Sequence, residues 1–138
     1  MSLDPRIRAL FDGANFAHVA TSMRDGAPHV TVLWAGLEGE RVLFCKEGGS
    51  VTIRNLRRDP RIAISVTNAD DPYEEAHVRG RVVDFRGYED AVDWIRDIAI
   101  QYTGSPYPKL PEDVVIAVVE IERAGYSIGG VRPPADPA

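Results

Sequence analysis

The chain has 138 residues, of which 44% are hydrophobic, and its formal net charge at pH 7 is −5. This length and composition allow a buried core, so we expect residues 1–138 to form a single domain. The negative charge argues against general nucleic-acid binding, and no apolar run approaches the roughly 20 residues that span a bilayer.

The first third of the chain predicts a helix followed by an antiparallel meander. Asp4 is a good N-cap and Pro5 fits the first helical position, so a helix begins there, and Gly13 can end it. Runs of strand-forming residues, joined by tight turns, then predict three successive strands. These strands are residues 16–22, 29–37 and 41–46.

The rest of the chain predicts three more strands and two more helices. A short helix over residues 50–59 ends before Pro60, and residues 88–102 form a helix with one apolar face. Six strands separated by short turns predict a mainly β fold with a few peripheral helices, a six-stranded antiparallel split barrel. The later strands are residues 62–67, 73–85 and 114–121, with an acidic loop at 68–72, a bulge at Gly80 and a loose proline-rich tail at 131–138.

The turn before the short helix is a candidate phosphate site. Gly48 and Gly49 precede the helix, and Ser50 can cap it by accepting from a backbone N–H one turn on. Glycines before a helix N-terminus leave N–H groups and the positive end of the helix dipole available to an anion. The segment also carries four arginines, which form either a solvated face or an attractor for an anionic tail: Arg54, Arg57, Arg58 and Arg61.

Four stretches of sequence together resemble a known family. The run RNLRRDPR at residues 54–61, followed by an alternating strand, is the most specific of them. Over roughly residues 5–130 the chain is similar to the split β-barrel family related to pyridoxamine 5'-phosphate oxidase. Within it, the chain resembles the branch that binds the deazaflavin coenzyme F-420 or a flavin, which implies an FMN-binding-like split barrel. The other stretches are FAHVATSMRDGAPHVTVLW at 16–34, HVRGRVV at 77–83, and a late strand ending in Tyr126.

The resemblance also implies where a cofactor lies. Its ring would run along residues 30–34, and Tyr126 would approach the ring from a second subunit. Ordinary strand alternation explains residues 30–34 equally well, and Tyr126 is equally well a core tyrosine. The implied cofactor-binding residues are Val30, Thr31, Val32, Leu33, Trp34, Lys46, Gly49, Ser50, Val51, Thr52, Arg54, Asn55 and Tyr126.

The phosphate of that cofactor would lie at residues 50–52, where the chain departs from the family pattern. Family members tend to carry Arg or Lys at the positions of Ser50 and Thr52. Neutral hydrogen bonds are weaker than charge-assisted ones, so phosphate binding here would rest on backbone N–H groups and hydroxyls. Lys46 and Arg54 are the basic groups that can substitute.

The implied function is that of a homodimeric oxidoreductase with a cofactor groove shared by the two subunits. Coenzyme F-420 would transfer a hydride to a conjugated small-molecule acceptor. Two alternatives stay open: an FMN-dependent oxidoreductase like pyridoxamine phosphate oxidase, and a non-catalytic protein that binds a flavin, a tetrapyrrole or a lipid. The sequence does not name the substrate, because the shape of the groove depends on the loops at residues 68–73 and 104–111.

Other kinds of site are disfavoured by the residues present. No catalytic acid or base stands out, and the histidines lack the spacing of metal ligands, so no metal site is expected. The single cysteine, Cys45, fits a reducing compartment and reads as a small hydrophobic residue. The first ten residues lack the apolar stretch of a secretory signal, so we expect a cytoplasmic protein without nucleic-acid or membrane partners. The histidines are His18, His29 and His77.

Overall fold

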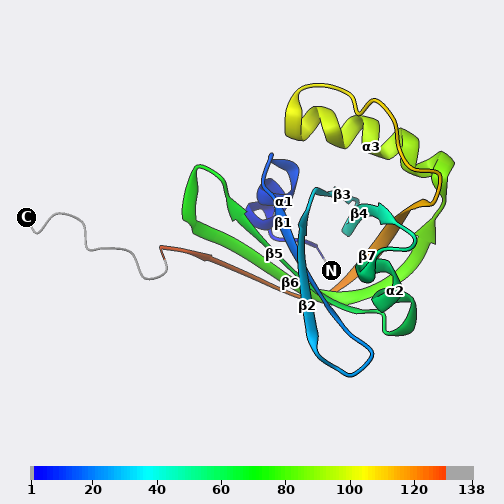
Figure 1. The fold of residues 1–138 in the computed structure, drawn as a ribbon. Helices are drawn as coiled ribbons and strands as arrows, with labels where there is room; N and C mark the ends of the chain where they lie inside the picture. The colour runs from blue at the N-terminus through cyan, green and yellow to red at the C-terminus, as the bar shows by residue number, and fades with distance from the viewer. Residues whose placement is uncertain (1, 130–138) are drawn as a thin grey trace, which may run out of the picture.

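A computed structural model describes residues 2–129 as a curled antiparallel sheet of seven strands with three helices packed around it (Figure 1). The mainly β split-barrel class expected from the sequence is confirmed. No helix within these residues is both long and apolar enough to cross a membrane. In chain order the elements are α1 (Pro5–Asp12), β1 (Ala17–Ser22), β2 (Pro28–Leu33), β3 (Ala35–Glu38), β4 (Arg41–Glu47), α2 (Val51–Arg58), β5 (Arg61–Asn68), β6 (Asp71–Arg86), α3 (Tyr88–Thr103) and β7 (Val114–Ile128).

The sheet has seven strands instead of the expected six because one predicted strand is broken at Trp34. Residues 29–37, expected as one strand, are divided between β2 and β3, which pair with β1 and β4 respectively. The expected meander is therefore wrong, and two separate hairpins take its place. The strand order β2-β1-β5-β6-β7-β4-β3 puts β2 and β3 at opposite edges of the sheet. Since only Trp34 separates them in the chain, the two edges come together and the sheet curls into a half-barrel.

Two other boundaries differ from the prediction. β6 begins at Asp71, so the expected acidic loop at residues 68–72 is a tight hairpin turn between β5 and β6. β7 continues to Ile128 instead of ending at residue 121, because it pairs with almost the whole length of β6. The tail at residues 131–138, expected to be loose, lies outside the described residues.

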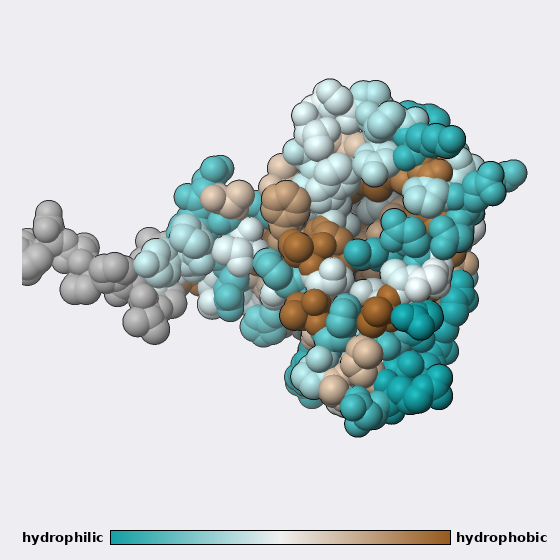
Figure 2. All heavy atoms as spheres, viewed as in Figure 1, coloured by the Kyte–Doolittle hydropathy of each residue, from teal (hydrophilic) through white to brown (hydrophobic). Residues whose placement is uncertain are grey.

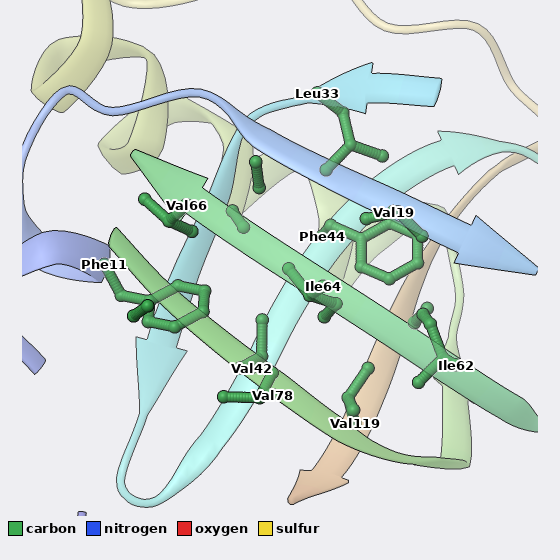
Figure 3. Packing of buried hydrophobic residues seen from close by; sticks show 14 of the residues in the cluster. Phe11, Val19, Leu33, Val42, Phe44, Ile62, Ile64, Val66, Val78 and Val119 are labelled. Atoms are coloured by element: carbon green, nitrogen blue, oxygen red, sulfur yellow. The ribbon is translucent and has the colours of Figure 1, made fainter. Parts of the chain in front are cut away.

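The hydrophobic core fills the inside of the half-barrel, where side chains from the strands and α1 converge (Figure 3). Phe11 and Phe44 are among its largest fully buried side chains. β4 and β7 are buried on both faces, because Leu43 and Val118 belong to a second cluster with Ile95 of α3. α3 thus covers the outer face of these strands, and this layer forms one wall of the site described below.

Two local predictions are confirmed. Ser50 caps α2, its Oγ accepting from the N–H of Ile53 at 3.2 Å, and the helix ends before Pro60. At Gly80 the register of β6 against β7 shifts, and a Cβ on this residue would lie 1.9 Å from the carbonyl oxygen of Glu120. A side chain has no room there, so the bulge requires glycine.

Candidate functional site

A groove with aromatic and aliphatic walls lies between β2, β4, α3 and the loop at residues 104–111. Its volume is about 340 Å³. We call it the aromatic groove. In Figure 2 hydrophobic side chains gather at the centre of the face where β2 runs in Figure 1. The lining residues are Phe16, Val32, Leu33, Trp34, Cys45, Lys46, Glu47, Ile95, Tyr107, Leu110, Pro111 and Val114.

The aromatic residues of this groove form a connected stack. The rings of Trp34 and Tyr102 lie parallel within 13°, with centroids 5.2 Å apart, and Tyr107 meets Trp34 edge-on at 6.3 Å. The Tyr102 hydroxyl donates to the carbonyl oxygen of Asn15 at 2.6 Å and also contacts both backbone groups of Ala35. These bonds tie α3 to the segment before β1 and to the start of β3, directly after Trp34, so the indole is held in one orientation.

Most polar side chains of the aromatic groove come from β4, which contributes Cys45, Lys46 and Glu47 to its lining. Cys45 is half-buried, and removal from water raises the pKa of its thiol to about 12, so it stays protonated at neutral pH. Burial likewise raises the pKa of Tyr102 above its ordinary value. Lys46 is the cation among the lining residues. The groove therefore offers flat apolar surfaces, the ammonium group of Lys46 and the carboxylate of Glu47, but no activated nucleophile.

β2 extends the apolar surface beyond the groove. Val30 is 64% exposed and Val32 is 53% exposed, which is unusual for valines in a sheet. β2 is an edge strand in the sheet order, so one side of its backbone has no neighbouring strand among the described residues. An edge of N–H and C=O groups beside apolar side chains suits a flat ring system that has a polar rim.

A second depression lies at the other end of β2, between the β1–β2 hairpin and α2. We call it the arginine pocket, and its volume is about 520 Å³. Asn55 is buried there, and its Nδ2 donates to Thr21 Oγ1 at 3.0 Å, which fixes the hairpin against α2. The side chains of Arg24 and Arg54 make no hydrogen bond or ion pair with the described residues, so both guanidinium groups are available to an anion. The lining residues are Met23, Arg24, Val51, Arg54, Asn55, Arg57 and Arg58.

The glycine turn between the two depressions is less open to an anion than the sequence predicted. The N–H of Gly48 donates to the backbone oxygen of Asp113 at 2.9 Å, and that of Gly49 reaches the Asp113 carboxylate at 3.4 Å. The N–H of Ser50 donates to Glu47. The expectation of unpaired N–H groups is therefore wrong for these three residues, because β7 begins beside the end of β4 and brings Asp113 to the turn.

The remaining donors at the α2 N-terminus are the N–H groups of Val51 and Thr52, which have no acceptor among residues 2–129. The Thr52 side chain is only 2% exposed, so its hydroxyl does not face a ligand at the surface of this chain. Any anion at this helix end would therefore meet backbone N–H groups and the side chains of the arginine pocket.

The structure brings most of the predicted site residues to the two depressions. Val32, Leu33, Trp34 and Lys46 line the aromatic groove, and Val51, Arg54 and Asn55 line the arginine pocket. Val30 and Thr31 lie between them along β2.

Tyr126 is the predicted residue that lies away from both depressions and from β2 and the glycine turn between them. Its ring lies under the guanidinium of Arg6, and its hydroxyl donates to Glu74. This hydrogen bond raises the pKa of Tyr126 and lowers that of Glu74. The single chain therefore places Tyr126 beside α1 and not beside β2.

Sequence reasoning missed most of the residues that close the aromatic groove. Phe16, Ile95 and Tyr107 come from three segments far apart in the chain. Ile95 and Tyr102 belong to the predicted helix over residues 88–102, whose apolar face indicates burial but not what the face packs against. The sequence gives no signal that Arg24 lines the arginine pocket, because charged residues are common in exposed hairpin turns. No three metal-ligating side chains lie together anywhere in residues 2–129.

Comparison with known proteins places this geometry in context. Residues 3–127 match the family described as pyridoxamine 5'-phosphate oxidase. An F420 reductase is similar in structure, with a TM-score of 0.77 and 28% identity, over 86% of this chain and 94% of that chain.

Two more distant solved structures share the fold. A conserved hypothetical protein from Mycobacterium tuberculosis has a TM-score of 0.77 and 19% identity, over 93% of this chain and 86% of that one. General stress protein 26 from Bacillus anthracis has a TM-score of 0.69 and 14% identity, over 92% and 95% of the two chains. No curated protein matches the chain.

Proposed function

The chain belongs to the pyridoxamine 5'-phosphate oxidase family, and from this premise we propose that it is an oxidoreductase that uses coenzyme F-420 to reduce a conjugated small molecule. The observation that carries the proposal is the aromatic groove beside the exposed edge of β2, with the arginine pocket at the other end of the same strand. The similarity to an F420 reductase supports the choice of cofactor.

The residues present fit such a cofactor. The apolar side of residues 30–34 and the ring of Trp34 can hold a flat deazaflavin, while the free backbone edge of β2 can bond to its polar rim. Arg24 and Arg54 complement its anionic tail, and the N–H groups of Val51 and Thr52 suit its phosphate. When bound, coenzyme F-420 supplies a hydride donor that the protein itself lacks.

The chain's own contribution to the reaction is positioning. The walls of the aromatic groove exclude water and align a flat acceptor with a flat donor, and alignment alone lowers a barrier by several kcal/mol, up to about 7–11. Lys46 can donate to an oxygen of the acceptor and stabilise negative charge that develops there. The protonated thiol of Cys45 does not compete as a nucleophile. This arrangement favours reduction of activated C=C or quinone-like acceptors over hydrolysis.

The proposed enzyme is a cytoplasmic homodimer. Val30 and Val32 leave an apolar strip on the surface of one chain, and a second copy would cover part of it. Tyr126, which lies away from β2 within its own chain, is a candidate to reach the cofactor of the partner subunit. The β5–β6 hairpin and the end of β7 extend away from the barrel and offer the reach for such a contact (Figure 1).

The test combines titration with single-turnover kinetics. Purified protein is titrated with coenzyme F-420, FMN and haem, and reduced F-420 is then mixed with saturating protein and a panel of quinones. We expect F-420 to bind and its reduced form to be oxidised only when protein and acceptor are both present. Turnover with reduced FMN but not F-420 supports the FMN-dependent alternative. Tight haem binding with no oxidation of either reduced cofactor refutes the enzyme and supports a non-catalytic binding protein.

A further inference from the structure

The glycine turn before α2 already holds an anionic group, and that group belongs to the chain itself. The carboxylate of Asp113 lies over both glycines, because a Cβ on either Gly48 or Gly49 would be 4.0 Å from its Oδ2. The same oxygen accepts from the N–H of Gly49 at 3.4 Å. Backbone N–H groups at the start of a helix are where an anionic ligand would be expected. Asp113 therefore stands where the phosphate of a ligand would otherwise approach.

The backbone holds Asp113 at the turn independently of its side chain. Glu47 pairs with Val114 in the antiparallel ladder of β4 and β7. The N–H of Gly48 extends this ladder by donating to the backbone oxygen of Asp113 at 2.9 Å. The side chain of Asp113 is exposed, so it can be replaced without emptying a core position or breaking the bond that fixes the residue.

The two sides of the α2 N-terminus differ in charge. At the turn, the exposed carboxylates of Glu47 and Asp113 lie close together, because these residues are at neighbouring positions of the β4–β7 ladder. Lys46 is the one basic residue between positions 44 and 53, and it lines the aromatic groove. On the other side, Arg54 belongs to the arginine pocket together with Val51. An anion is therefore repelled at the turn and attracted at the pocket.

This difference separates two kinds of phosphate. A phosphomonoester such as that of FMN carries a charge of about −1.5 to −2 at pH 7 and has three free oxygens. The phosphate of coenzyme F-420 is a diester, which carries a single negative charge and continues into a tail. Repulsion by a fixed carboxylate grows in proportion to the charge of the ligand, so Asp113 disfavours the monoester more strongly. A diester can bond to the N–H groups of Val51 and Thr52 while its tail continues towards Arg54.

From this arrangement we propose that Asp113 determines which cofactor the chain accepts. Its carboxylate excludes a terminal phosphate from the glycine turn, so the site takes a flavin-like ring that is linked to a phosphodiester and rejects a phosphomonoester such as FMN. The inference rests on the proposed function and names the residue that makes the choice of cofactor. Asp113 acts through charge at the phosphate and is not a catalytic residue.

The test is fluorescence titration of the full chain with FMN, riboflavin and coenzyme F-420 at low ionic strength. Riboflavin has the ring of FMN without its phosphate, so the ratio of the two Kd values isolates the phosphate. Wild type should bind FMN no more tightly than riboflavin. Asp113→Asn should bind FMN about fivefold more tightly than wild type does, with riboflavin unchanged and a smaller gain for F-420. Asp113→Lys should tighten FMN binding further, because a charge-assisted bond can form.

The matched control is Glu112→Gln, which makes the same change in net charge one residue earlier. Glu112 is exposed, and its side chain has no hydrogen bond or ion pair with the residues that the structure describes. All three affinities should stay at their wild-type values in this variant. The gain of Asp113→Asn should also disappear near 1 M salt, where the Debye length is about 3 Å, whereas a gain caused by altered packing would persist. Circular dichroism checks that each variant is folded.

The outcomes separate this inference from the proposed function. The role of Asp113 is overturned if Asp113→Asn binds FMN no better than wild type, if Glu112→Gln gains as much, or if FMN binds none of the variants. It is also overturned if wild type already binds FMN about fivefold or more tightly than riboflavin, because the phosphate then contributes despite the carboxylate. If F-420 does not bind wild type while Asp113→Asn gains affinity for FMN alone, the proposed cofactor is wrong and the exclusion by Asp113 stands.

Discussion

The two ends of β2 are built in different ways. The aromatic groove is assembled from five separated segments and held by ring stacking and burial. The arginine pocket needs only the β1–β2 hairpin and α2, and its character comes from exposed charge. The pKa values of two groups show the same contrast. Burial raises the pKa of Cys45, which lines the aromatic groove. The Arg61 guanidinium lowers the pKa of Asp59, just beyond the end of α2, to about 2. Binding at a site made by packing should be insensitive to salt, whereas binding at a site made by charge should weaken as the salt concentration rises.

The largest expected effect concerns how well the aromatic groove excludes water from Cys45. The pKa of Cys45 is raised from 9.0 to about 12, so at pH 8 the folded chain holds roughly 1,000-fold less thiolate than the unfolded chain. Alkylation of Cys45 by iodoacetamide should be slower by a similar factor in native buffer than in denaturant. Ser105→Cys in a Cys45→Ala background is the exposed control and should react quickly. If the native protein is alkylated equally fast at both positions, water reaches Cys45 freely, and the aromatic groove is not a site made by burial.

The next effect concerns ring stacking. Trp34→Ala removes the indole that stacks on Tyr102, and we expect a loss of about 1–2 kcal/mol in F-420 binding, roughly 5- to 30-fold in Kd. Because dispersion and burial are not screened, the loss should be the same at low and at high salt. Trp94→Ala is the matched control, since Trp94 lies on α3 over Gly36 and does not line the groove. Fluorescence titration of F-420 measures both variants, and an equal loss in Trp94→Ala argues against direct stacking.

The charged end should respond to salt. Arg54→Ala removes an unpaired guanidinium from the arginine pocket and should weaken F-420 binding by about 1 kcal/mol, roughly fivefold, at low ionic strength. The difference from wild type should disappear near 1 M salt, where the Debye length falls to about 3 Å. Arg96→Ala, on α3, should bind like wild type throughout. If the Arg54→Ala difference persists at high salt, the arginine acts by packing and not by charge.

The smallest effect is the acid sensitivity of the Asp59–Arg61 pair. Arg61 lowers the pKa of Asp59 in the folded chain. The pair therefore stabilises the fold fully above about pH 4, and this contribution is lost as the pH falls towards 2. Wild type should therefore lose slightly more stability between these pH values than Asp59→Asn does. The difference is small because the pair is exposed. Urea unfolding at pH 4 and at pH 2 measures the difference, with Asp93→Asn as the exposed control. If the free energy of unfolding falls equally in wild type and in Asp59→Asn, the Asp59–Arg61 pair does not stabilise the fold.

Local patterns predicted the elements that are fixed by nearby residues. Ser50 and Pro60 bound α2 as expected, and Gly80 marks a bulge, because capping, proline geometry and close backbone approach act within a few residues. Family resemblance placed Val32, Trp34 and Lys46, which do line one groove. The break at Trp34 was not predictable, because the residues on both sides of it are equally good strand formers.

The sequence by itself determined the fold class, the basic character of α2 and the apolar alternation of β2, since each depends on residues that are close together in the chain. Only the tertiary structure decided that Asp113 occupies the glycine turn, that Tyr102 stacks on Trp34, and that Arg79 and Arg123 stand opposite each other. Each of these contacts joins residues more than 40 positions apart. Their meeting depends on how the sheet curls and pairs, and no local pattern encodes that.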